Sequence, residues 1–124
     1  MTLKELYFEI DGDYDQAINV LRIEKLIDKH IRKFPTGGVV ANVIEAGKSM
    51  DPTGLFESAH AMKGVCSNLG LTKLAASASK ITEEYRPGNA RKLTDGEIKA
   101  VLAEIETLYA KTVKGIEKYV ESAL

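Results

Sequence analysis

The segment DPTGLFESAHAMKGVCSNLG, residues 51–70, has helix signals at both of its ends. Asp51 is suited to accept hydrogen bonds from the first free amides of a helix, and Pro52 suits the first helical position because it has no N–H group to leave unbonded. Gly70 favours the left-handed conformation that ends many helices. No second proline interrupts the stretch, so it predicts one helix about 25 Å long.

The faces of this helix follow from a rotation of about 100° per residue. Five apolar residues fall within a sector of about 80° and predict the buried stripe: Leu55, Ala59, Met62, Cys66 and Leu69. His60, Gly64 and Ser67 point away from that stripe, and Lys63 lies at its edge. We therefore expect the imidazole of His60 to face solvent.

The neighbours of His60 indicate what an exposed imidazole would bind. Gly64 lies one turn later, where glycine costs about 1 kcal/mol relative to alanine but leaves the ring uncrowded. Lys63, three residues after His60, is placed to bring an ammonium group beside the ring. Neutral imidazole is a competent nucleophile near neutral pH. This arrangement favours a compact anion with several charges, such as a phosphoryl group.

The pattern of residues 60–64, His-Ala-Met-Lys-Gly, followed by Asn-Leu-Gly at residues 68–70, resembles the signature of histidine-containing phosphotransfer (HPt) domains. In that family these residues recur in one helix of a four-helix bundle. The resemblance implies a phosphorelay intermediate, in which His60 accepts a phosphoryl group from an aspartyl phosphate on a receiver domain and passes it to another. It also implies that Lys63 offsets the negative charge of the transition state.

By the same resemblance, the partners are receiver domains of response regulators and a hybrid sensor histidine kinase. We expect docking on the surface around His60, with these candidate contact residues: Phe56, Ala59, Lys63, Gly64 and Ser67. The sequence has no phosphate-cradling GxxxxGK[ST] motif and no kinase motif, so we expect a phosphocarrier without an ATP site rather than an enzyme. Two histidines thirty residues apart, without suitably spaced carboxylates, predict neither a metal site nor a cofactor.

Composition limits the remaining possibilities. The 124 residues are enough for one domain, residues 1–124, and the net charge of −1 argues against binding nucleic acid or a membrane surface. No apolar run approaches the roughly 20 residues of a membrane span, and the N-terminus lacks the features of a signal peptide. The single cysteine cannot form an internal disulfide. We expect a monomer in the cytoplasm.

Helical periodicity covers most of the chain. Residues 3–9 predict a short helix, and residues 14–34 are compatible with one bent helix or with two. Further helices are predicted at residues 39–47, at residues 74–85, and after the capping-box pattern that starts at Thr94. The short links favour antiparallel neighbours. The expected fold is all-α, an antiparallel up-down four-helix bundle with one or two short extra N-terminal helices.

Several residues favour structural roles. His30 falls on the apolar stripe of its helix, so we expect it to be buried, and Cys66 is expected in the core. Glu83 and Glu84 are expected on a solvated face. Three other functions are also compatible with the sequence: a module that docks receivers without phosphotransfer, a structural helical adaptor, and a hydrolase with His60 as its nucleophile.

Overall fold

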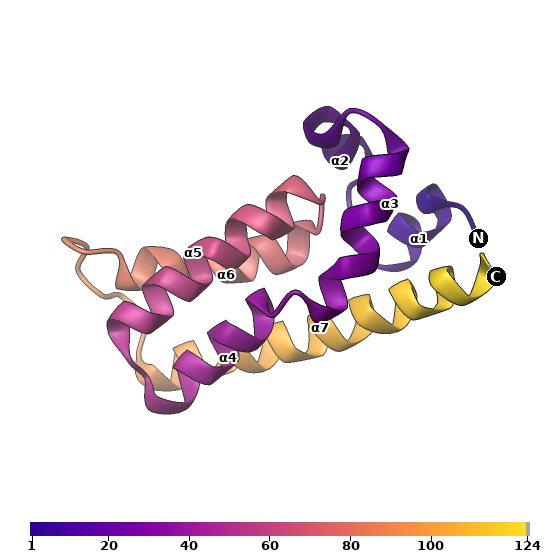
Figure 1. Ribbon diagram of the computed structural model, residues 1–124. Coiled ribbons are helices and arrows are strands. Elements are labelled where there is room, and N and C mark those ends of the chain that lie inside the picture. The colour runs from indigo at the N-terminus through magenta and orange to yellow at the C-terminus, as the bar shows by residue number, and fades with distance from the viewer. Residues whose placement is uncertain (124) are drawn as a thin grey trace.

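The computed structural model describes residues 1–123 and contains helices but no strand over that range. The elements are α1 (Leu3–Glu9), α2 (Tyr14–Leu21), α3 (Glu24–Lys33), the 3-10 helix η1 (Phe34–Thr36), α4 (Val39–Ser49), α5 (Pro52–Asn68), α6 (Thr72–Tyr85) and α7 (Asp95–Ser122). Helices α4 to α7 run alternately in opposite directions and pack side by side (Figure 1). The predicted all-α, antiparallel four-helix bundle is confirmed.

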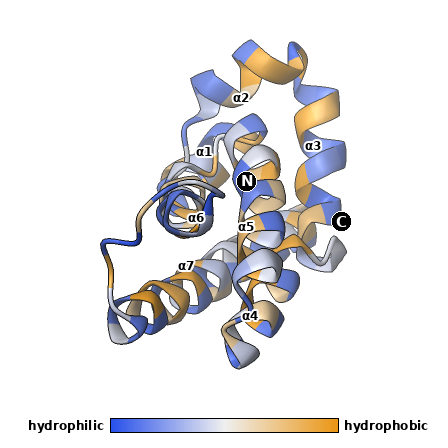
Figure 2. Ribbon diagram, turned by 90° about the vertical axis from the view of Figure 1, so that its left-hand side faces the viewer, coloured by the Kyte–Doolittle hydropathy of each residue, from blue (hydrophilic) through white to orange (hydrophobic). Residues whose placement is uncertain are grey.

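The N-terminal region forms three helices, α1, α2 and α3, ahead of the bundle. The sequence was compatible with one or two helices over residues 14–34, and the structure has two, because Arg22 adopts a φ of +76° that no helix interior accepts. The chain therefore leaves α2 and starts α3 two residues later, at Glu24. Helices α2 and α3 stand at one side of the bundle (Figures 1 and 2).

The core lies between the four bundle helices and continues along α7. All five residues of the predicted stripe on α5 are buried, together with seven large residues of α7: Ile98, Val101, Leu102, Ile105, Thr112, Ile116 and Tyr119. At 28 residues, α7 is longer than its partners, and its C-terminal half supports α1 and α3 (Figure 1). The N-terminal helices are thus held against the same long helix as the bundle.

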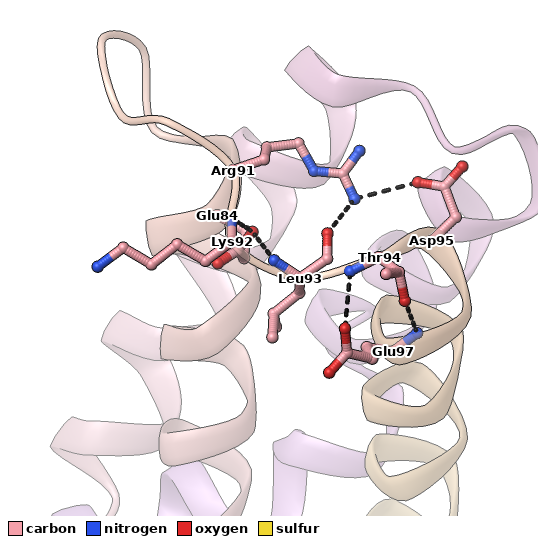
Figure 3. A network of polar contacts seen from close by, with 7 residues as sticks. All are labelled: Glu84, Arg91, Lys92, Leu93, Thr94, Asp95 and Glu97. Carbon is pink, nitrogen blue, oxygen red and sulfur yellow. Dashed lines mark hydrogen bonds and ion pairs between the residues drawn. The ribbon is translucent and has the colours of Figure 1, made fainter.

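Hydrogen bonds and ion pairs hold the connection between α6 and α7 (Figure 3). The carboxylate of Glu84 accepts hydrogen bonds from the backbone N–H groups of Lys92 and Leu93, at 2.9 and 3.0 Å. The expected capping box at the start of α7 is present, since Thr94 and Glu97 each accept a hydrogen bond from the other's backbone N–H. Glu84 therefore has a structural role, which its expected position on a solvated face did not indicate.

Candidate functional site

Helix α5 begins and ends where the sequence predicts. The Asp51 carboxylate accepts a hydrogen bond from the N–H of Gly54 at 3.1 Å, and Pro52 is the first helical residue. At the other end, Gly70 has a φ of +68°, and the N–H groups of Gly70 and Leu71 donate to the carbonyls of Ser67 and Cys66. This pair of bonds is a Schellman motif. Both ends of the helix that carries His60 are therefore fixed.

The N-terminal helices also bind the C-terminal end of α5. The Tyr7 hydroxyl donates to the Leu69 carbonyl at 2.6 Å, the Gln16 side-chain amide donates to the Ser67 carbonyl at 2.7 Å, and the backbone N–H of Asp13 donates to the Gly70 carbonyl at 2.7 Å. A helix leaves its last carbonyls without intrahelical partners, and these three donors bond to carbonyls at or just beyond this end, of which that of Ser67 also accepts from Gly70. Sequence reasoning could not predict this arrangement, because the partners lie more than fifty residues apart.

His60 lies near the middle of α5 with its side chain exposed, as the helical rotation predicts. A Cβ atom built on Gly64 would meet no neighbouring atom within 4 Å, so the space beside the imidazole on the C-terminal side is open. We call the surface formed by Phe56, His60, Lys63, Gly64 and Ser67 the histidine face. Chemically, it presents an accessible imidazole to any molecule that docks from solvent.

Two rings are stacked on this face. The Phe56 ring lies nearly parallel to the imidazole of His60, with centroids 5.8 Å apart and an angle of 16° between the planes. The guanidinium carbon of Arg86, at the end of α6, lies 5.5 Å from the centre of the Phe56 ring. Sequence reasoning missed Arg86, because only the pairing of α5 with α6 brings it to this place.

Two cations lie on the side of the histidine face that borders α6. The hydrogen-bonded Arg86 guanidinium, and to a smaller extent the charges of Arg86 and Lys63, hold the pKa of Glu83 below its ordinary value. Lys63 is therefore close enough to the end of α6 to act on a carboxylate there, and its side chain is half-buried. One cation from each of two helices thus borders the histidine face.

The docking candidates differ in exposure. Phe56, Lys63 and Ser67 are half-buried and Gly64 is exposed, so all four are accessible on the histidine face. Ala59 is completely buried, and its prediction as a partner contact is wrong because its methyl group belongs to the core stripe. Two exposed residues on the same side of α5, Glu57 and Asn68, were not among the predicted candidates.

The remaining ionisable candidates lie away from this face. His30 is exposed, and the expectation that it is buried is wrong because α3 turns only a narrow stripe, Ile27 and Ile31, toward the protein. Cys66 is in the core as expected, and burial raises the pKa of its thiol to about 12. Over residues 1–123, no cluster of three histidine, cysteine or carboxylate side chains is arranged to hold a metal ion. Within the same range, no helix is both long and apolar enough to cross a membrane.

Comparison with known families matches residues 20–111 to the family described as Hpt domain. The match spans more than half of the chain, from the end of α2 into α7, and the protein therefore belongs to the Hpt family. Domains of this family are phosphocarriers rather than kinases, take part in histidine phosphotransfer in phosphorelays, and interact with receiver domains and kinases. Neither the curated proteins nor the solved structures contain a match.

Proposed function

We propose that this protein is a phosphorelay intermediate that carries a phosphoryl group on His60. The observation that carries the proposal is the exposed imidazole beside the open space at Gly64, on a helix of an Hpt-family bundle that is fixed at both ends. A nucleophile on a rigid element keeps its orientation while a partner docks, which lowers the entropic cost of reaching the transition state.

The transfer is an in-line displacement at phosphorus. A lone pair on one ring nitrogen of His60 attacks the phosphorus of a receiver's aspartyl phosphate, while the other nitrogen carries the ring proton. A P–N bond forms, the bond between phosphorus and the carboxylate oxygen breaks, and the aspartate leaves with that electron pair. The reverse reaction passes the group to a second receiver. Negative charge on the phosphoryl oxygens is offset by the Lys63 ammonium.

The partners in this proposal are response-regulator receiver domains and a hybrid sensor histidine kinase, and they dock on the histidine face. Phe56 supplies apolar surface there, and Gly64 lets a partner approach the imidazole without a side chain in the way. We take residues 1–124 as one domain, because the N-terminal helices are bonded directly to the end of α5.

The test is transfer of labelled phosphoryl from a phosphorylated receiver. We expect label on the protein in a form that is labile to acid and stable to alkali. His60→Gln should remove the label, whereas His30→Gln should retain it, since His30 is also an exposed histidine but lies on another helix. Label that persists in His60→Gln would overturn the proposal. Binding without labelling would indicate a docking module, and neither binding nor labelling would indicate a structural adaptor.

Lys63→Ala tests the second residue of the mechanism. Removing a cation that stabilises the transition state should slow transfer by about tenfold or more. Lys99→Ala, an exposed lysine on α7, is the matched control and should transfer at the wild-type rate. Equal rates for the two variants would remove Lys63 from the mechanism.

A further inference from the structure

An ion pair lies at the edge of the histidine face. Two nitrogens of the Arg86 guanidinium donate to the two carboxylate oxygens of Glu83, at 2.9 and 3.2 Å. The same guanidinium lies over the Phe56 ring, and that ring is stacked on the imidazole of His60. A continuous set of contacts therefore leads from His60 through Phe56 to Arg86 and its partner Glu83.

Another anion can replace Glu83 as the partner of Arg86 in this ion pair. The side chains of Arg86 and Glu83 are 39% and 51% exposed, and ion pairs in such positions contribute little to stability because water screens them. Arginine binds phosphate with two parallel hydrogen bonds as readily as it binds a carboxylate. A new anion nearby can therefore compete with Glu83 for the guanidinium.

Phosphorylation of His60 would create that anion. A phosphoryl group brings close to two negative charges and three strong acceptor oxygens. It would stand on the histidine face together with Lys63. Arg86 lies over the Phe56 ring, which is stacked on His60, and both cations have long, flexible side chains. The carboxylate of Glu83 and the phosphoryl group would then attract the same two cations.

We propose that Glu83 is a resident counter-anion, which competes with the phosphoryl group on His60 for Arg86 and Lys63 and thereby biases the transfer equilibrium toward the unphosphorylated protein. Glu83 is a positioning residue here, since it acts through the two cations and does not touch the reacting atoms. The inference rests on the proposed function and adds to it a determinant of how readily the carrier gives up its phosphoryl group.

The adjacent glutamate helps to separate this role from a structural one. Glu84 holds the α6–α7 connection through two backbone N–H groups (Figure 3), whereas the Glu83 carboxylate bonds mainly to Arg86, with one longer contact of 3.4 Å from the Asn89 amide. The shorter Asn89 bond, at 3.0 Å, goes to the Glu83 backbone carbonyl and survives substitution of the side chain. Replacing Glu83 therefore leaves the main hydrogen bonds of the α6–α7 connection in place.

The experiment measures the equilibrium constant for transfer between a phosphorylated receiver and the full chain. Glu83→Gln should shift the equilibrium toward the phosphorylated protein by about two- to fivefold at low salt, and added salt should reduce the shift. Glu45→Gln is the matched control, because Glu45 forms an exposed i,i+3 ion pair with Lys48 on α4. The control should leave the equilibrium at its wild-type value.

Arg86→Gln supplies the second arm of the test. It should shift the equilibrium in the opposite direction, and in its presence Glu83→Gln should lose at least half of its effect. Equal constants for Glu83→Gln and Glu45→Gln would overturn the inference, as would an undiminished effect of Glu83→Gln in the Arg86→Gln background. Either of these two outcomes would be compatible with normal labelling of His60 in the wild-type protein. Failure of the wild-type protein to accept label would instead overturn the proposed function, and the inference with it.

Discussion

Gly64 offers a direct test of whether access to the imidazole limits transfer. It lies inside α5, it has no left-handed backbone, and a Cβ atom there would meet nothing within 4 Å. Gly64→Ala should therefore gain the full difference in helix propensity, about 1 kcal/mol in the free energy of unfolding. For a chain of this size, that gain corresponds to a rise in Tm of about 4 °C.

Substitutions that add a side chain at Gly64 should also impair transfer. Side chains on a helix lean toward its N-terminus, so a side chain at position 64 would extend over His60, one turn earlier. Gly64→Leu should lower the transfer rate by about tenfold or more, and Gly64→Ala should lower it less. Stability and transfer would thus change in opposite directions.

The assays are thermal unfolding followed by circular dichroism and single-turnover transfer from a labelled receiver. Gly96→Ala is a suitable control, because Gly96 is an exposed helical glycine on α7 whose added Cβ would meet its nearest neighbour, the Thr94 hydroxyl, at 3.8 Å. It should raise stability slightly and leave transfer unchanged. Wild-type transfer rates in both Gly64 variants would mean that access to the imidazole does not limit transfer.

Two further predictions concern the junction between the N-terminal helices and the bundle. Gly70→Ala should lower the free energy of unfolding by at least about 2 kcal/mol, since Gly70 has a φ of +68° and a Cβ atom there would clash with the Asp13 carbonyl oxygen; an unchanged urea midpoint would contradict this. Hydrogen bonds from Lys111 and Lys73, at 2.7 and 3.2 Å, lower the pKa of Asp11. A lowered carboxyl pKa stabilises the fold above the ordinary value of about 4, and this contribution is lost as the pH falls through the folded pKa. Asp11→Asn should therefore reduce the loss of stability on acidification, measured as urea midpoints between about pH 6 and pH 3; identical pH profiles for the two proteins would refute the assignment.

The local features of the site were predictable from the sequence. Asp51 caps α5, Gly70 ends it, and the capping box at Thr94 begins α7, as the sequence indicated. Each of these interactions joins residues no more than five positions apart along the chain. The exposed position of His60 followed in the same way, because the helical rotation fixes the angle between a residue and the apolar stripe of its own helix.

Residues at the borders of the stripes were predicted less well. The same rotation placed Ala59 in the core stripe, yet it was also expected to contact a partner, and its complete burial excludes that contact. His30 was assigned to a stripe that proved narrower than its pattern of apolar residues suggested. How wide a stripe is buried depends on how many neighbouring helices cover it, which one helix's sequence does not specify.

By itself, the sequence determined the ends of α5, the face that carries His60, and the all-α class of the protein. Only the tertiary structure brought Arg86 to the Phe56 ring and the Tyr7 hydroxyl to the end of α5. The physical reason is range. Caps and helical faces depend on backbone geometry within a turn or two, whereas the approach of residues from different helices depends on how whole helices pack, a result that many weak contacts decide together.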